Sequence, residues 1–278
     1  MTNKEENKVV PKVNINWYPG HMAKTKRQII EDLKLIDIVV EVLDARIPIS
    51  SQNPDVREYT KEKKKIMVLN KSDLANEIET KKWVKYFNKQ GISAIITDAN
   101  SGKGINEVIL EIKNIAKQNQ EKYINKGRIG KSVRVLILGI PNVGKSSFIN
   151  RITKKSSMQV GNRPGVTRQK QWIRLADGIE LMDTPGVLWP KFESEEVALN
   201  LAYTGTIKDD ILEKVEVAYR LLKYLIENYL NNVIERYKID KQELDNIMKQ
   251  DIEENDKIYE MMSLIAKKRG AILSGRKN

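Results

Sequence analysis

The chain has 278 residues, of which 40% are hydrophobic and 31% are charged, enough apolar material for the core of more than one domain. It contains no cysteine and a single histidine, His21, which excludes disulfide frameworks, thiolate zinc sites and multi-histidine metal sites. No apolar run approaches the length of a membrane span, and residues 1–10 lack the apolar core of a signal peptide, so we expect a soluble cytoplasmic protein with no membrane partner.

The formal net charge of +12 is unevenly distributed along the chain. Residues 1–195 carry 35 Lys and Arg against 22 Asp and Glu, whereas residues 196–278 carry 14 against 15. Two stretches, 113–134 and 267–277, are especially basic. Such patches favour a polyanionic partner, most commonly a nucleic acid. The alternative is a lysine-rich surface that is simply solvated.

The first part of the chain alternates predicted helices and strands. After polar residues 1–14, the turn at 17–22 leads into a helix that ends near Leu35. The patterns then predict, in order, a strand at 37–43, a short helix at 54–61, a strand at 65–69, a helix at 77–89, a strand at 92–97 and a helix at 105–120. Further strands are predicted in the apolar run that begins at Val133 and near 171–175 and 179–182. This alternation indicates an α/β fold with a mostly parallel sheet, whose ligand lies at the carboxyl ends of the strands.

The pattern changes to helix alone from about Ser194. Apolar residues recur at helical spacing over 215–237 and 258–265. We therefore expect a nucleotide-binding domain at 1–192 and a small all-α domain at 193–278. The alternative is a helical cap on the sheet.

The stretch VRVLILGIPNVGKSSF, residues 133–148, reads as a buried strand, a glycine-rich turn and a helix. Gly139, Gly144, Lys145 and Ser146 fit G-x-x-x-x-G-K-[ST], in which backbone N–H groups surround phosphate oxygens. Lys145 is expected to reach the β- and γ-phosphates and Ser146 to bind Mg²⁺. Further nucleotide contacts are expected from the loop residues Asn142, Val143 and Ser147. The motif therefore predicts a P-loop that binds a nucleoside triphosphate.

A second motif, Asn70-Lys71-Ser72-Asp73, follows the strand at 65–69 and fits N-K-x-D. The Asp73 carboxylate suits the N1–H and N2–H₂ donors of guanine, which adenine does not present together. Asn70 is expected to bond the base edge, and Lys71 to lay its methylenes over the ring. The prediction of GTP and GDP as ligands requires Asn70 and Asp73 to fold back beside Lys145.

A third motif, Asp183-Thr184-Pro185-Gly186, follows the strand at 179–182. Asp183 is expected to hold Mg²⁺ through water, and Gly186 to offer its N–H to the γ-phosphate, which gives it a part in catalysis together with Lys145. Thr167 lies in the loop GNRPGVTRQK and is expected to complete the metal shell when GTP is present.

These motifs together make the chain resemble the circularly permuted GTPases, and most closely the ribosome biogenesis GTPase A family. The resemblance rests on WYPGHMAKTKRQI, DARIP, NKSD, GIPNVGKSS, PGVT and DTPGVLWPKF, in that permuted order, and on the helical C-terminal region. It implies a cytoplasmic GTPase whose GTP form binds a late precursor of the large ribosomal subunit and its rRNA, and which leaves after hydrolysis. We expect no DNA partner. The loop Asp98-Ala99-Asn100 departs from the usual Ser-Ala-Lys, and only Ala99 is assigned a contact, from its N–H to guanine O6.

The sequence leaves the origin of catalysis open. Val187 stands where signalling GTPases have a glutamine that orients water, so turnover without a partner should be slow. The resemblance points to His21 as a catalytic candidate, and the alternative is a residue at the start of a helix or one that contacts RNA. It also suggests that Asn142 helps to bind K⁺ near the phosphates.

Three other functions can be compared with these motifs. An RNA-binding scaffold that uses GTP as a structural ligand with little turnover is consistent with the missing glutamine. A small-molecule kinase is disfavoured by the guanine-reading motif at residues 70–73, and a signalling GTPase is disfavoured by the positive charge of the chain.

Asp44 and Arg46 lie at a strand end on the ligand side of the sheet. They either sense the nucleotide state or connect two loops through an ion pair, and we favour the ion pair.

Overall fold

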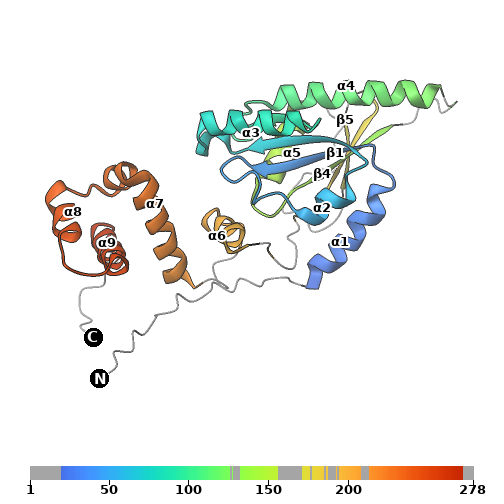
Figure 1. The fold of residues 1–278 in the computed structure, drawn as a ribbon. Helices are drawn as coiled ribbons and strands as arrows, with labels where there is room; N and C mark the ends of the chain where they lie inside the picture. Colours follow the sequence, from blue (N-terminus) through green and yellow to red (C-terminus); the bar gives the residue numbers. More distant parts are fainter. Residues whose placement is uncertain are drawn as a thin grey trace. The chain divides into compact units, whose positions relative to one another are not determined.

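The computed structural model describes residues 20–125, 127, 132–155, 171–175, 177–184, 186, 192, 194–207 and 213–271. The chain divides into two compact units, one formed by Ile15–Ile207 and the other containing Lys208–Asn278. The first unit contains the sheet, and the second is helical (Figure 1).

The strands of the sheet unit are β1 (Ile38–Asp44), β2 (Lys64–Asn70), β3 (Ser93–Ile96), β4 (Val133–Leu138), β5 (Gln171–Leu175) and β6 (Ile179–Asp183). Its helices are α1 (Gly20–Leu33), α2 (Pro54–Tyr59), the 3₁₀ helix η1 (Ser72–Leu74), α3 (Glu77–Lys89), α4 (Ile105–Ile124), α5 (Lys145–Lys155) and α6 (Glu195–Tyr203). The helical unit contains α7 (Lys214–Tyr237), α8 (Lys241–Met248) and α9 (Glu254–Lys268).

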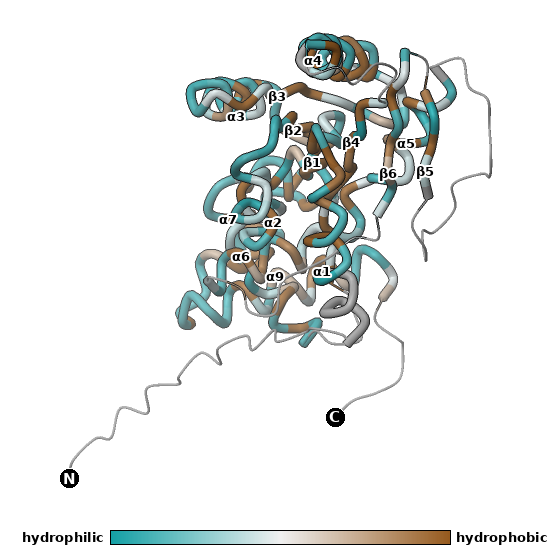
Figure 2. The backbone as a smooth tube through the Cα atoms, turned by 90° about the vertical axis from the view of Figure 1, so that its right-hand side faces the viewer, coloured by the Kyte–Doolittle hydropathy of each residue, from teal (hydrophilic) through white to brown (hydrophobic). Residues whose placement is uncertain are grey.

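The six strands form one sheet in the order β3-β2-β1-β4-β6-β5. All neighbours are parallel except β5 and β6, which are antiparallel. The central strands β1 and β4 are apolar along most of their length, because helices cover both faces of a parallel sheet. Figure 2 shows these strands in brown, with α4 on one side of the sheet and α1 on the other. The predicted α/β fold with a mostly parallel sheet is therefore confirmed.

The order of the strands in the sheet differs from their order along the chain. β1 and β2 come first in the chain, yet β1 pairs with β4, which carries the P-loop. In register, Asp44 at the end of β1 lies opposite Asn70 at the end of β2. The carboxyl ends of β1, β2, β4 and β6 therefore meet at one edge of the sheet.

The division between the units lies after Ile207, whereas the sequence analysis placed the boundary at 192/193. The difference is α6, which packs with the sheet unit. Its residues Ala198 and Leu201 are buried, and the Asn200 amide donates to the Ser50 hydroxyl at 3.1 Å. Ile207, at the end of this unit, is also buried.

The helical unit is built around an apolar cluster that α7, α8 and α9 share, made of Tyr219, Leu222, Val233, Ile239, Ile247, Ile258 and Met261. The short α8 was not predicted as a separate helix, although its start has a full capping box between Asp240 and Glu243. Within the described part of the chain, none of the helices has both the length and the apolar character needed to cross a bilayer.

Candidate nucleotide-binding site

Asn70 connects three loops at the carboxyl edge of the sheet. Its side-chain amide donates to the Val143 carbonyl of the P-loop at 2.8 Å. Its carbonyl oxygen accepts from the Ala99 N–H at 3.0 Å and from the Thr97 hydroxyl at 3.2 Å. The side chain is 2% exposed. The structure therefore brings the NKSD segment beside the P-loop, although 73 residues separate Asn70 from Val143.

The loop contacts of Asn70 were not expected from the sequence. A buried amide takes partners among the loop groups that surround it, and here these are the carbonyl of Val143, the N–H of Ala99 and the hydroxyl of Thr97. The expected contacts of Asn70 with the base edge and of the Ala99 N–H with guanine O6 stay predictions.

Glycine is required in the P-loop by close approach. Gly144 has a φ of +87°, and a Cβ there would lie 2.5 Å from the Asn70 amide nitrogen. A Cβ on Gly139 would lie 2.7 Å from the Val42 carbonyl oxygen of β1. Gly186 packs against the same loop, where a Cβ would lie 2.8 Å from the Pro141 nitrogen. Only glycine allows the backbones of the P-loop and of residue 186 to pack this closely.

Lys145 begins α5 and is 9% exposed. Burial lowers the pKa of its ammonium, and the charge of the nearby Asp183 opposes that shift. A buried cation of this kind is stabilised by an anion, and the N-terminal end of α5 attracts the same charge. The chemistry of the site therefore fits a bound phosphate group.

Asp183 and Ser146 offer the oxygen ligands that Mg²⁺ prefers. Asp183 ends β6 and is 2% exposed, and Ser146 follows Lys145 in the first turn of α5. The neighbouring Thr184 hydroxyl donates to the Ile137 carbonyl at 2.9 Å, which fixes the end of β6 against β4. These residues fit a magnesium ion that is shared with nucleotide phosphates.

The loop after β3 is organised by Asp98, to which the sequence analysis gave no role. Its carboxylate accepts from the Asn100 N–H at 2.8 Å and the Ser101 N–H at 3.1 Å. A side-chain hydrogen bond with Ser101 holds the pKa of Asp98 below its usual value. Arg151 of α5 donates to the carbonyls of Ala99 and Asn100. The loop is thus fastened to the helix that follows the P-loop, a contact that no sequence motif indicates.

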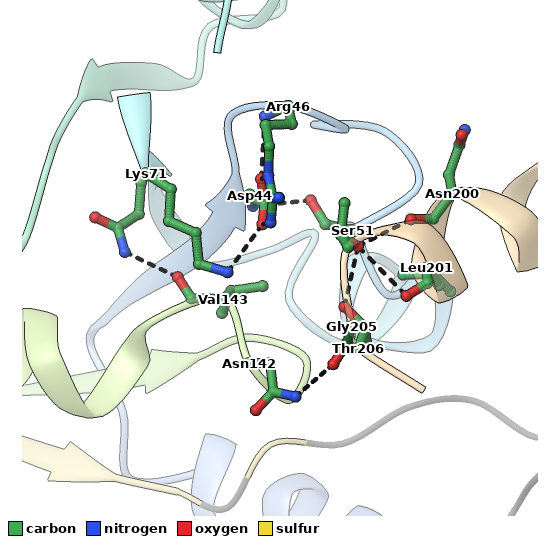
Figure 3. Close-up of polar contacts among 12 residues, drawn as sticks. Asp44, Arg46, Ser51, Lys71, Asn142, Val143, Asn200, Leu201, Gly205 and Thr206 are labelled. Carbon is green, nitrogen blue, oxygen red and sulfur yellow. Dashed lines mark hydrogen bonds and ion pairs between the residues drawn. The ribbon is translucent and has the colours of Figure 1, made fainter. Parts of the chain in front are cut away.

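Asn142 occupies the left-handed region with a φ of 62°. Its side-chain amide donates to the Gly205 carbonyl (Figure 3). Gly205, with a φ of 72°, ends α6 in a Schellman motif: its N–H donates to Ala202 and the Thr206 N–H donates to Leu201. The P-loop therefore holds the turn that follows α6.

Lys71 and Arg46 both contact the carboxylate of Asp44. Arg46 donates from Nε at 2.9 Å and from a terminal nitrogen at 2.7 Å, and the Lys71 ammonium lies 3.2 Å from Asp44 Oδ2 (Figure 3). The favoured ion pair between Asp44 and Arg46 is present. Its link to Lys71 was not predicted, although adjacent parallel strands that end at Asp44 and Asn70 would have indicated it.

Several predicted site residues lie at the limits of the described structure. Thr167 and Val187 fall outside the described residues. His21 lies in α1, but its side chain is not among those described. Ser147 and Asn142 are exposed in the P-loop region, Val143 is buried, and Asp73 is exposed in η1.

Family models match two overlapping parts of the chain. One, described as a 50S ribosome-binding GTPase, matches residues 134–266. The other, described as an RsgA GTPase, matches residues 56–193. The first match extends from β4 and the P-loop into α9.

The chain is similar to several ribosome biogenesis GTPase A proteins. It is 43% identical to the one from Bacillus cereus over 261 residues, covering 94% of this chain and 84% of that protein. It is 38% identical to the one from Thermotoga maritima over 206 residues, covering 74% and 71%. Mitochondrial ribosome-associated GTPase 1 from Mus musculus is 33% identical over 232 residues, covering 80% and 70%.

Two solved structures of YlqF have the same fold. The GDP-bound structure gives a TM-score of 0.56 at 27% identity and covers 88% of this chain and 94% of that one. The GNP-bound structure from T. maritima gives 0.53 at 28% identity and covers 89% and 95%. Both similarities extend over most of each chain.

Proposed function

The chain belongs to the ribosome biogenesis GTPase A family of circularly permuted GTPases, and from this premise we propose that it assists assembly of the large ribosomal subunit in the cytoplasm. It is a GTPase involved in ribosome biogenesis. In the proposed cycle the GTP form binds a late large-subunit precursor, and hydrolysis promotes release. The observation that carries the nucleotide part is the Asn70 contact with Val143, because it joins the base-reading segment to the phosphate-binding loop.

The proposed chemistry assigns a role to each group at the edge of the sheet. Asp73 reads the guanine edge, and Lys71 covers the face of the base. Lys145 and the N–H groups of the P-loop hold the phosphates and stabilise the charge that develops during transfer to water. Ser146, Asp183 and Thr167 hold a magnesium ion, which neutralises phosphate charge when it is bound.

The γ-phosphate contact of Gly186 supplies the switch in this proposal. Gly186 packs on the backbone at Pro141, so loss of the γ-phosphate can move both the segment at Gly186 and the P-loop. The sequence places Trp189, Pro190 and Phe192 between Gly186 and the helical region. The hydrogen bond between Asn142 and Gly205 offers a second, noncovalent route to that region, because Gly205 lies three positions before Lys208 in the chain.

His21 is the proposed source of partner-stimulated hydrolysis, since Val187 cannot orient water. Intrinsic turnover is expected to be about 10⁻⁴ to 10⁻² s⁻¹. The His21→Ala variant should bind GTP and the ribosomal precursor normally and lose the stimulation. Unchanged stimulated turnover would remove His21 from the mechanism and leave it the role of a helix-start or RNA-contacting residue.

Potassium is the proposed counter-cation at Asn142. The amide nitrogen of Asn142 is engaged by the Gly205 carbonyl, which directs the side-chain oxygen, the cation-binding end, away from Gly205. A potassium ion bound there supplies positive charge at the phosphates in place of an arginine finger. Equal turnover in potassium and sodium buffers would contradict this assignment.

The helical unit and the basic stretches are the proposed rRNA contacts. The charged groups do not contribute equally, since Lys113 pairs with Asp177 at 2.8 Å and Arg134 with Glu180 at 3.3 Å. Lys267 and Arg269 at the end of α9 are exposed. They are better placed to meet phosphates.

Co-sedimentation with purified large-subunit precursors tests the function directly. Binding should be strong with a nonhydrolysable GTP analogue and weak with GDP, and should fall steeply with salt. Mature large subunits and small subunits serve as controls. Sedimentation that is independent of the nucleotide would contradict the switch.

A further inference from the structure

The Asp44 carboxylate is a buried anion that two cations share. It is 2% exposed and accepts from the Arg46 N–H at 3.1 Å in addition to the two guanidinium contacts. The Lys71 ammonium lies 3.2 Å from Oδ2, the oxygen that also accepts from the terminal nitrogen of Arg46. A local pair between residues 44 and 46 would explain Arg46 alone. It does not explain why Lys71, which directly follows β2, contacts the same carboxylate.

The backbone places Asp44 where it can act on Lys71. β1 and β2 are parallel, with Asp44 opposite Asn70, and the ladder continues with the Ala45 N–H donating to the Asn70 carbonyl at 2.8 Å. The Asp44 N–H donates to the Ser51 hydroxyl at 3.0 Å, which fixes the strand end from the other side. The carboxylate is therefore held rigidly next to the start of the base-reading segment.

Lys71 adopts the left-handed conformation, with a φ of 61°, which a residue with a Cβ adopts only at an energetic cost. It is also the N-terminal cap of η1, and its carbonyl accepts from the Leu74 N–H at 3.0 Å. The conformation of Lys71 therefore sets the direction of the turn that presents Asp73. Figure 3 shows the Lys71 side chain directed toward Asp44.

The positive charges around Asp44 stabilise its ionised form. Burial by itself would raise the pKa of Asp44, but the Arg46 guanidinium and the Lys71 ammonium outweigh it and hold that pKa below its usual value. The hydrogen bond that Arg46 donates to Asp44, followed by the charges of Asp44 and Asp73, raises the pKa of Arg46 against its burial. Asp44 thus stays ionised at neutral pH, and Arg46 lies within the electrostatic reach of both carboxylates.

We propose that Asp44 is a specificity-determining positioning residue for the guanine base. It holds the Lys71 ammonium, which keeps the aliphatic stem of Lys71 over the base and the η1 turn in the orientation that aims Asp73 at the base edge. This inference rests on the guanine contacts proposed above for Lys71 and Asp73. In this proposal Asp44 acts through Lys71, so its effect appears in binding and base selectivity and not in the hydrolysis step.

The test measures equilibrium binding of a fluorescent GDP analogue to the full-length chain, with GDP, IDP and ADP as competitors. Asp44→Asn keeps the shape and one acceptor but loses the charge that holds Lys71. It should raise the Kd for GDP about tenfold and reduce the preference for GDP over IDP at least about threefold, with the kcat at saturating GTP within about twofold. Lys71→Met, which keeps the stem, should weaken GDP binding by a similar factor.

The double variant decides whether the two residues act as one unit. Asp44→Asn with Lys71→Met should bind GDP no more weakly than either single variant, because the second change removes an interaction that is already lost. Multiplicative effects, or an unchanged Kd in folded Asp44→Asn, would overturn the proposal. Glu180→Gln is the control, since it breaks the ion pair with Arg134 in the same sheet.

Two further comparisons keep the inference testable. If Asp44→Asn does not fold, Lys71→Arg should retain GDP binding within about threefold while Lys71→Met loses it, and an equal Kd for both would overturn the proposal. Wild-type protein that binds ADP as tightly as GDP would instead refute the proposed guanine specificity. Selective wild-type protein with a normal Asp44→Asn variant would refute only the role of Asp44.

Discussion

The sheet unit and the helical unit differ in what they bury. The buried polar and charged residues of the described chain all lie between Asp32 and Thr206, in the sheet unit, and they include Asp44, Asn70, Lys145 and Asp183. The core of the helical unit is formed by apolar and aromatic residues such as Leu222, Ile247 and Met261. One unit therefore keeps charges in a low-dielectric environment, where they act strongly on a ligand.

The difference in buried polar groups indicates that the sheet unit is built to bind a ligand and the helical unit to present a surface. Burying a polar group costs free energy unless the group has a hydrogen-bond partner. A buried loop network such as that of Asn70 is therefore expected where it holds a binding site together. The helical unit needs only a stable shape that presents its surface. We therefore expect core mutations in the two units to have different consequences, and the following predictions test that expectation.

The largest effect is expected from Lys145→Ala. Removing this buried ammonium at the start of α5, where the phosphates are proposed to bind, should reduce GTP turnover at least about a thousandfold. The measurement is multiple-turnover phosphate release, with and without ribosomal particles. Lys154→Ala, an exposed lysine of the same helix, should be unaffected. Comparable losses in both variants would show that the charge of α5, and not the buried position, matters.

In the helical unit, Met261→Ala should cost about 3 kcal/mol of unfolding free energy, since Met261 is fully buried in the apolar cluster. Chemical denaturation followed by circular dichroism measures this loss. The Kd for GDP should not change, while binding to the large-subunit precursor weakens. Met248→Ala, at an exposed position of α8, is the control. A weakened GDP affinity in Met261→Ala would contradict the separation of the two tasks.

Asp73→Asn should weaken GTP binding roughly thirtyfold, because the guanine donors lose a charged acceptor. An asparagine amide can donate to the C2 carbonyl of xanthine, so affinity for XTP should rise. Competition titrations with GTP, XTP and ATP measure both changes. The exposed carboxylate of Asp251 provides the control variant Asp251→Asn. Loss of GTP binding without any gain for XTP would argue against direct reading of the base by Asp73.

The smallest effect concerns Glu41, a buried carboxyl group in β1. Burial raises its pKa from 4.5 to about 7, against the opposing charge of Lys65. In the unfolded chain the group ionises near its ordinary pKa, so its contribution to stability is complete below pH 4.5 and is lost as the pH rises to about 7. Glu41→Gln should remove this slope, which amounts to about 1–3 kcal/mol.

The measurement is the free energy of unfolding between pH 4.5 and 8, compared for wild type and Glu41→Gln. Glu107→Gln, an exposed residue of α4, should leave the pH dependence unchanged. If both variants follow the wild-type curve, Glu41 is ionised in the folded protein and the raised pKa is wrong.

Much of the sheet unit could be predicted from local signals. Continuous apolar runs identified β1, β2 and β4, because parallel strands covered on both faces contain few polar residues, and the Asn76 and Asn53 caps agree with the predicted starts of α3 and α2. The membership of α6 was missed because its nine residues look like any short amphipathic helix. Its place in the sheet unit depends on contacts with distant residues such as Ser50.

The sequence alone determined the fold class, the family and the identity of the three nucleotide motifs, since each motif is a short run whose residue types carry the chemistry. Tertiary structure alone decided how the motifs hold one another: Asn70 is bonded to the P-loop, Arg151 to the loop after β3, and Lys71 to Asp44. The physical reason is that buried polar groups take whichever partner the packing brings within reach. For residues that are far apart in the chain, that partner is set by strand order and register.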